Sequence, residues 1–410
     1  MPDPVAVSAV LFQEAIDYQR SKVGMPSRAW TDLWEGMHAR SFVVAGATKA
    51  ALVADLKAAV DKALAEGRTI ADFRKDFDTI VQRHGWDYNG ERGWRTRTIL
   101  ETNLRTAYAA GKWQQAQATK DRRPYLRYVA VLDRRTRPDH RGWHGTVLPI
   151  DAAWWATHYP PCGWGCRCTV QTLSDRDLTR YGYSVSDEPE VEWVDRRVTT
   201  PDGATTVQVP KGIDPGWAYN PGAAGLGTSE ARMAFERHGP WEALEAPGHK
   251  EAPPLPPLEA VKPAAKLGPR ARPGDPDHLR RLWREGVGAD SVTLKDPLGD
   301  RVQLSQAVVE HMLEEPRRQD GREAVFPQLR ELVEHPAEIW VGFARSAVSG
   351  RVMLRRRYVR LFDTGKERVV ALVADLDNGV WSGLTTMPAQ PRYLKALRIG
   401  VRVYDELAEE

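Results

Sequence analysis

Nine prolines fall between residues 247 and 276, and four of them form the run PPLPP at residues 253–257. Proline lacks a backbone N–H and fixes its own φ, so a segment this rich in proline cannot form the interior of a helix or a sheet. It favours an extended linker. A length of 410 residues also exceeds one ordinary hydrophobic core. We therefore expect an N-terminal domain at residues 1–225, a linker at 226–275 and a C-terminal domain at 276–410.

The N-terminal region predicts mostly helix. Apolar residues recur at every fourth position between residues 48 and 66, which places them on one helix face: Leu52, Leu56, Val60 and Leu64. Gly67 follows, where a helix end favours a residue that adopts positive φ. A second helix is expected at 94–118, with a buried side formed by Leu100, Leu104, Ala107 and Tyr108. Residues 125–132 predict a strand, and Asp202-Gly203 predicts the turn of a hairpin.

Residues 132–170 hold all three cysteines, three of the ten histidines and four of the fifteen tryptophans. Thiolates and imidazoles are ligands that zinc prefers, and a tetrahedral site needs four of them. The candidate ligands are His140, His144, Cys162, Cys166 and Cys168. The two histidines would share one face of a helix, but a C-x-C pair in a strand points to opposite faces. The segment therefore predicts either a structural zinc site within residues 140–168 or cysteines that pack as small apolar residues.

Composition and charge limit the class of protein. No run approaches 18 consecutive apolar residues, so we expect no contact with a membrane core, and the first residues lack the pattern of a secretory signal. Three cysteines so close together are typical of a reducing compartment. Residues 92–141 hold thirteen Lys and Arg against four Asp and Glu, and residues 345–402 hold twelve against four. Such basic regions are expected either to bind the phosphate backbone of a nucleic acid or to be ordinary solvent-exposed faces.

The C-terminal region has a pattern of its own. Helices are expected at 303–315 and 325–334, then strands at 338–344, 351–362, 367–376 and 380–387, a short helix at 391–398 and a last strand at 401–407. Asp377-Asn378-Gly379 predicts a hairpin turn. Helices followed by an antiparallel sheet are an α+β layout, so the fold class expected for the whole chain is multidomain α+β.

Several C-terminal residues suit RNA cleavage without a metal or other cofactor. This chemistry needs a base for the ribose 2′-hydroxyl, an acid for the leaving oxygen and groups that stabilise the charged phosphorane. His311 is the acid–base candidate, because imidazole titrates near neutral pH. Arg355 can bind a phosphate with two hydrogen bonds. The other candidates donate hydrogen bonds or positive charge: Tyr358, Thr385, Thr386 and Arg398. An ordinary structural role is the alternative for each of these residues.

The runs ILETNLRTAYAAGKW, LDRRTRPDHRGWHGTVLPID, HYPPCGWGCRCTV and VPKGIDPGWAYNPG resemble the Mu F-like head-morphogenesis family of tailed phages, over about residues 10–225. The resemblance implies a minor head protein at the portal, on which DNA packaging or ejection depends. It implies portal, scaffold and capsid proteins and viral DNA as partners, and the virion interior and host bacterial cytoplasm as locations. Many family members carry cysteines at the positions of Arg137 and His140, and Arg137 departs from that pattern, which weakens the zinc hypothesis.

The C-terminal layout, from LSQAVVEHM through FPQLRELVEHPAEIW and RYVRLF to WSGLTTM and YLKALRIG, resembles phage-associated barnase–EndoU–colicin–RelE-like nuclease domains over about residues 280–405. The resemblance implies a ribonuclease. His311 would match the family's helix histidine, Tyr358 its central-strand residue, and Thr385 or Thr386 its late-strand hydroxyl. If an arginine replaces the second acid–base group, the domain would bind RNA without cutting it.

Three other functions compete with this interpretation. A purely structural virion protein would use the C-terminal domain to bind nucleic acid, portal or scaffold without catalysis. A zinc-supported nuclease would use His140 or His144 as a base near Asp139, but no acidic metal-binding pair accompanies them. ADP-ribosyl transfer would need a nicotinamide cofactor, and the sequence has no G-x-G-x-x-G fingerprint.

Overall fold

A computed structural model describes residues 12–225, 241–247, 252, 254, 268–272, 275–314, 321–347, 350, 352–362, 368–377, 380–389 and 397–406. The chain forms two compact units. The first comprises Met1–Pro240 with Ala347–Val352, and the second comprises Trp241–Ser346 with Met353–Glu410. The domain boundaries expected from the sequence stay a prediction. Within the expected linker, residues 241–244 form a strand that belongs to the second unit.

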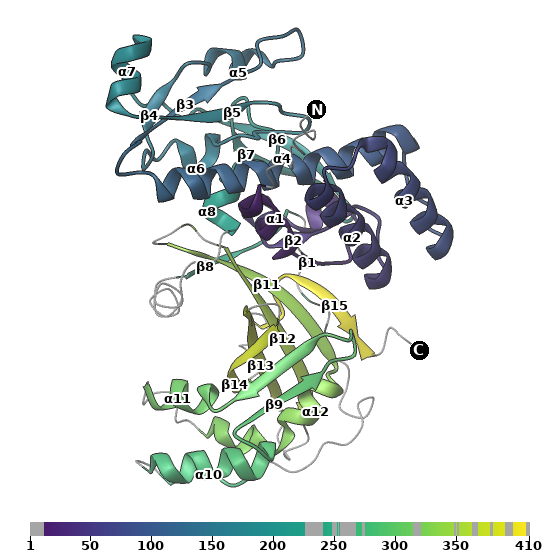
Figure 1. Ribbon diagram of the computed structural model, residues 1–410. Coiled ribbons are helices and arrows are strands. Elements are labelled where there is room, and N and C mark those ends of the chain that lie inside the picture. Colours follow the sequence, from purple (N-terminus) through teal and green to yellow (C-terminus); the bar gives the residue numbers. More distant parts are fainter. Residues whose placement is uncertain are drawn as a thin grey trace, which may run out of the picture. The chain divides into compact units, whose positions relative to one another are not determined.

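The first unit is mostly helical (Figure 1). Its helices are α1 (Gln13–Arg20), α2 (Ala50–Glu66), α3 (Ile70–His84), α4 (Arg92–Ala118), α5 (Pro138–Gly142), α6 (Trp155–His158), α7 (Asp175–Tyr181) and α8 (Pro221–Gly225), with two 3-10 turns, η1 (Trp30–Asp32) and η2 (Glu35–Ala39). Its strands are β1 (Val23–Gly24), β2 (Ser41–Phe42), β3 (Tyr125–Val129), β4 (Val147–Pro149), β5 (Thr169–Leu173), β6 (Trp193–Thr200) and β7 (Gly203–Pro210).

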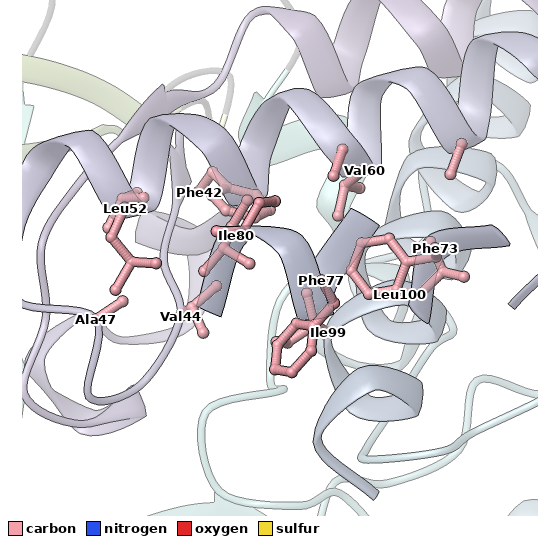
Figure 2. Close-up of a cluster of buried hydrophobic side chains, with 14 residues drawn as sticks. Phe42, Val44, Ala47, Leu52, Val60, Phe73, Phe77, Ile80, Ile99 and Leu100 are labelled. Atoms are coloured by element: carbon pink, nitrogen blue, oxygen red, sulfur yellow. The ribbon is translucent and has the colours of Figure 1, made fainter. Parts of the chain in front are cut away.

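Helices α2, α3 and α4 enclose an apolar core. Figure 2 shows the side chains of this cluster, which include Leu52, Val60, Phe77 and Leu100. The predicted buried face of α2 is confirmed, and Gly67 ends the helix with a φ of 65°. Helix α4 confirms the second predicted helix.

One prediction about α4 is wrong, because Tyr108 is 44% exposed. Ala107, Ala110 and Gly111 are buried on one face of the helix, and Tyr108 points about 100° away from Ala107, toward solvent. Simple helical periodicity does not show which neighbouring residue faces the core when small residues do the packing.

Small sheets complete the first unit. Strands β4, β3 and β5 form one antiparallel sheet, and β6 and β7 form the predicted hairpin. Thr200 pairs with Gly203, so the turn is at residues 201–202, one residue before the predicted Asp202-Gly203. Strands β1 and β2 form a short parallel pair. The β4-β3-β5 sheet matters most here, because its strands border the cysteine segment.

The second unit consists of helices and one curved sheet. Its helices are α10 (Pro276–Val287), α11 (Ala307–Glu314), the 3-10 helix η5 (Arg322–Gln328) and α12 (Leu329–Glu334). Its strands are β8 (Trp241–Leu244), β9 (Ser291–Lys295), β10 (Arg301–Ser305), β11 (Glu338–Ser346), β12 (Val352–Phe362), β13 (Arg368–Asp377), β14 (Val380–Ala389) and β15 (Val401–Asp405). The strand order is β15-β11-β12-β13-β14-β10-β9, and β8 also pairs with β11 (Figure 1).

The α+β layout is confirmed, with three differences. The sequence predicts a helix from residue 303, but residues 301–305 form β10, because they alternate buried and exposed side chains in a hairpin with β9. Strand β10 also pairs with β14 in parallel, so the sheet is not wholly antiparallel. Residues 322–328 form a 3-10 helix around Pro327. Most of the helix expected at 391–398 and the centre of the turn at 377–379 lie outside the described residues.

Among the described residues, no helix combines the length and the apolar character needed to cross a membrane.

Candidate functional site

One histidine and two cysteines of the 132–170 segment converge on a single point. His140 lies on α5, and Cys166 and Cys168 lie in the loop that leads into β5. The Nδ1 atom of His140 is 3.6 Å from the sulfur of Cys166 and 3.6 Å from that of Cys168. His140 and Cys166 are buried, and Cys168 is half-buried. These three residues, named here the His–Cys group, are the described residues that could hold a metal ion.

The spacing within the His–Cys group fits a tetrahedral metal. Zinc bonds of about 2.0 Å to nitrogen and about 2.3 Å to sulfur, at a tetrahedral angle, place the nitrogen and sulfur about 3.5 Å apart. The observed distances agree with this value. The group supplies three ligand atoms and leaves a fourth position for another donor.

The hydrogen bond on the far side of His140 orients its ring. Nε2 lies 2.9 Å from the carbonyl oxygen of Gly212 and can donate to it, which leaves the lone pair of Nδ1 facing the sulfurs. Gly212 has a φ of 83°, and a Cβ there would collide with Asp139 and Trp143. Only glycine therefore brings this carbonyl close enough to the imidazole.

The pKa values of the two thiols of the group shift in opposite directions. A hydrogen bond from Cys168 lowers the pKa of Cys166 below its usual value, and His140 acts in the same direction, while burial opposes them. The same bond, with burial, raises the pKa of Cys168. The pair therefore presents one thiolate and one thiol, and a thiolate is the form that binds a metal.

The structure corrects two expectations about this segment. Cys166 and Cys168 were expected to point to opposite faces, but they precede β5 and are not held in its pleat, so both reach His140. His140 and His144 were expected to share a helix face, but α5 ends at Gly142. His144 instead accepts a hydrogen bond from the backbone N–H of Ala130, 3.1 Å away, and lies outside the group.

Cys162 lies beside the His–Cys group without joining it. Its thiol donates to the carbonyl of His158 at 3.3 Å, and the Tyr128 hydroxyl is 3.9 Å from its sulfur. Burial raises the pKa of Cys162, so the sulfur stays protonated. Cys162 thus packs as a buried apolar side chain, which the sequence had left open.

The loop that carries the cysteines is tied to a later segment of the chain. The carboxylate of Asp214 accepts hydrogen bonds from the backbone N–H of Trp164 at 2.8 Å and from Arg137 at 2.7 Å. The backbone N–H of Asp214 donates to the Cys162 carbonyl. Arg105 of α4 donates to the carbonyls of Gly165 and Cys166. Arg137 therefore forms an ion pair with Asp214 in this chain.

In the second unit, the central strand β12 carries a buried ionic network. Asp296, in the turn between β9 and β10, accepts hydrogen bonds from Arg356 at 2.6 Å and from the Tyr358 hydroxyl at 2.9 Å. Asp300 contacts the other nitrogen of Arg356 at 2.7 Å. Two more hydrogen bonds to Asp296 come from the backbone N–H groups of Leu298 and Asp300. The turn of the β9–β10 hairpin therefore reaches β12, although β13 and β14 lie between them in the sheet.

Three of the predicted catalytic residues have buried side chains that bind groups within the second unit: Tyr358, Thr386 and Arg398. Tyr358 is fully buried, and burial raises its pKa, so its hydroxyl stays protonated. Arg398 is buried and makes two hydrogen bonds of 2.6 Å with Glu338, on β11. Thr386 is buried and its hydroxyl donates to the Arg322 carbonyl.

The remaining candidates lie elsewhere in the same unit. Arg355 is half-buried on the opposite face of β12 from Arg356, as the alternation of a strand predicts. His311 lies on α11 and Thr385 on β14, but their side chains lie outside the described part of the chain.

Sequence reasoning missed the two aspartates that hold Arg356 and Tyr358. The signal was present as D-P-L-G-D at residues 296–300, a turn in which both ends are acidic. The glutamate that holds Arg398 was also missed. Each of these pairs joins residues about 60 positions apart, which local patterns do not show.

Two family models match separate parts of the chain. Residues 54–171 match the family described as Phage Mu protein F like protein. Residues 279–405 match the family described as phage-Barnase-EndoU-ColicinE5/D-RelE like nuclease2. The first range contains the whole His–Cys group, and the second contains the β12 network.

Two curated proteins are similar to the chain. The "Putative capsid assembly protein F" of Escherichia phage Mu is 36% identical over 248 residues, which cover 53% of this chain and 56% of that protein. The "Mu-like prophage FluMu F protein" of Haemophilus influenzae is 36% identical over 224 residues, covering 49% and 54%. The chain thus spans about half the length of the curated relatives it matches. No solved structure matches it.

The β12 network generates a stability prediction. Asp296→Ala leaves Arg356 and Tyr358 buried without their main acceptor, so we expect a loss of about 3–5 kcal/mol in the unfolding free energy of the second unit. Asp300→Ala is the matched control, because the Asp300 side chain is 46% exposed and its removal should cost about 1 kcal/mol or less. Urea unfolding followed by circular dichroism measures both. Equal costs for the two variants would contradict the assigned role of Asp296.

Proposed function

We propose that this chain, which joins a phage Mu F-like region to a phage barnase–EndoU–colicin–RelE-like nuclease region, is a minor head protein that carries an RNA-cleaving effector. It would act at the portal during capsid assembly, DNA packaging or ejection. Its partners would be portal, scaffold and capsid proteins and viral DNA. It would occupy the virion interior and the host bacterial cytoplasm.

The observation that carries the head-protein proposal is the 36% identity to the phage Mu protein over 248 residues. The structure gives physical reasons for the sequence motifs that first suggested the family. Gly212 and Asp214, from the VPKGIDPGWAYNPG run, hold His140 and the cysteine loop. Arg105, from the ILETNLRTAYAAGKW run, holds the same loop from α4. Residues of these motifs therefore contact one another in the fold. This agrees with a head role like that proposed from the similarity to the phage Mu protein.

The head role can be tested in a phage that encodes this chain. A stop codon at Trp34 should abolish infectious particles and leave heads that lack packaged DNA, because a minor head protein is needed before or during packaging. Plaque counts and electron microscopy of the heads measure this effect, and mass spectrometry of purified wild-type particles should detect the protein. A plasmid copy should restore the titre. A normal titre without the protein would overturn the proposal.

The nuclease proposal rests on the family match over residues 279–405. In the proposed reaction, His311 removes the proton of the ribose 2′-hydroxyl or protonates the leaving 5′-oxygen, and Arg355 neutralises charge on the phosphorane. Thr385 would add a hydrogen bond. The other three candidates would support the site without contacting RNA, because their polar groups are hydrogen-bonded within the unit. Tyr358 binds Asp296, Thr386 binds the Arg322 carbonyl and Arg398 binds Glu338. Cleavage by the 2′-hydroxyl would leave a 2′,3′-cyclic phosphate and a free 5′-hydroxyl.

We expect the full-length protein to cleave RNA in EDTA, and His311→Ala to lose about 10²–10⁴-fold in rate, the usual contribution of a general acid or base. Gel analysis with identification of the cyclic phosphate measures this. His335→Ala is the control, because that exposed histidine contacts Arg360 only through its backbone carbonyl. A fragment that begins at residue 276 is unsuitable, since it would lack β8, which pairs with β11.

The competing proposal is a structural module that binds nucleic acid or portal without catalysis. Tyr358 is hydrogen-bonded to Asp296, and Arg398 is hydrogen-bonded to Glu338. These contacts favour the structural module, because they leave fewer predicted catalytic groups for a substrate. RNA that binds the wild-type protein and is not cleaved would support this alternative and overturn the nuclease proposal.

We also propose that the His–Cys group binds one structural zinc ion. Its ligands would be His140 Nδ1 and the sulfurs of Cys166 and Cys168, with a fourth donor still to be identified. The ion would fix the loop before β5 against α5. The support is the donor chemistry, the 3.6 Å spacings and the carbonyl of Gly212 behind the imidazole.

The zinc proposal predicts about one zinc ion per purified chain, as for other structural sites. Cys166→Ser and His140→Ala should each lose most of the metal and lower the thermal stability of the first unit, because metal binding stabilises the folded state. Elemental analysis and thermal unfolding measure the two effects. His144→Ala should keep its zinc, since His144 lies outside the group. Equal zinc content in all variants would contradict the assigned ligands.

A further inference from the structure

The first unit contains a hollow that the proposed functions do not use. Its volume is about 300 Å³, and it is bordered by α4, by residues 22–45 and by residues 216–219. Its lining includes four tryptophans: Trp30, Trp94, Trp164 and Trp217. A volume of about 300 Å³ is at the lower end for small-molecule sites and suits one aromatic ring system with a short substituent.

The tryptophans pack against one another and form one side of the hollow. Trp164 packs edge-on against Trp30 and Trp217, with ring centroids 5.8 Å and 5.1 Å apart. Gly216 has a φ of 82°, and a Cβ there would come within 2.9 Å of the Trp30 ring. Glycine therefore lets Trp30 lie directly against the backbone. Trp94 and Trp164 remain 58% and 39% exposed, so aromatic surface is available to a ligand at the mouth.

A buried amine also lines this hollow. Lys22 is 6% exposed, and its Nζ lies 4.9 Å from the centre of the Tyr18 ring. Among the described residues, this Nζ forms no hydrogen bond and no ion pair with an oxygen. Asp61 is near enough to influence Lys22 but is bound by Lys57 at 2.7 Å. Burial lowers the pKa of Lys22 to about 7, which is the expected result for an amine that lacks a counter-ion.

The other polar groups of the lining do not supply that counter-ion. The lining contains no aspartate or glutamate. Arg95 donates three hydrogen bonds to the carbonyls of Asn89 and Ala45, which hold its guanidinium in place. Burial, followed by the charge of Lys22, lowers the pKa of His38 to about 4, so its ring is neutral. In the described lining, Lys22 is therefore the buried cation that has no hydrogen-bond acceptor.

We infer that this hollow binds an aromatic group that carries a carboxylate. The ring lies against the tryptophans, and the carboxylate forms an ion pair with Lys22. Stacking on aromatic side chains and a desolvated ion pair are each stronger in such a hollow than on an open surface. The group belongs either to a free aromatic acid or to an aromatic residue at the C-terminus of another protein.

A single negative charge suits this site better than a phosphate. One amine balances one carboxylate, whereas a phosphate carries more charge and is normally held by several N–H groups or by an arginine fork. The arginine that lines this hollow already donates three hydrogen bonds to backbone carbonyls. A neutral ring would leave the buried amine without an acceptor.

The test uses the full-length protein with N-acetyl-L-tryptophan and its uncharged amide, compared by calorimetry and saturation-transfer NMR. We expect the acid to bind roughly tenfold or more tightly than the amide, a difference that one buried ion pair readily supplies. Lys22→Met should weaken the acid to the level of the amide and leave the amide unchanged. The acid–amide comparison needs no variant, so it remains decisive if Lys22→Met does not fold.

Lys62→Met is the matched control, because Lys62 is an exposed lysine on α2 that does not line the hollow. It should bind the acid like wild type. The peptide acetyl-Gly-Gly-Trp with a free carboxylate distinguishes the two sources: tighter binding than N-acetyl-L-tryptophan identifies a protein C-terminus, and weaker binding identifies a free acid. Equal binding of acid and amide, preference for adenosine monophosphate, or no binding at millimolar concentration would each overturn the inference.

Discussion

The first unit depends on the contacts that residues 212–217 make with His140 and with the loop that carries the cysteines. Gly212 orients His140, and Asp214 binds the backbone of Trp164 and the side chain of Arg137. The same segment supplies Gly216 and Trp217 to the tryptophan hollow. One stretch of chain therefore shapes both a set of metal-binding atoms and a nearby aromatic surface. The glycines in it are required because the backbone itself makes the contacts.

The second unit depends on buried ionic pairs instead. Arg356, Arg360 and Arg398 are all buried, and their carboxylate partners are Asp296 with Asp300, Glu331, and Glu338. A buried charge is tolerated only when it is paired and hydrogen-bonded, so each pair fixes one element against the sheet. Basic residues that suggested a phosphate-binding face thus include several that hold the fold. The half-buried Arg355 lies on the other face of β12.

Local patterns predicted many elements correctly, and their failures have physical causes. The face of α2 and the hairpin at 193–210 follow from side-chain periodicity and turn chemistry, which depend on neighbouring residues. Strand β10 was mistaken for the start of a helix, because its identity comes from pairing with β9 and β14. Tyr108 was placed inside because periodicity alone does not weigh the small buried alanines beside it.

The sequence by itself determined the two-part organisation suggested by the prolines, the helical character of the first part and the residue types of the candidate metal site. Only the tertiary structure decided which of those residues meet. His140 joins Cys166 and Cys168 across 26 and 28 positions and is oriented by Gly212 across 72. His144, four positions away, does not join them. Such a group forms where loops are brought together by packing, and spacing along the chain determines proximity only within a regular helix or strand.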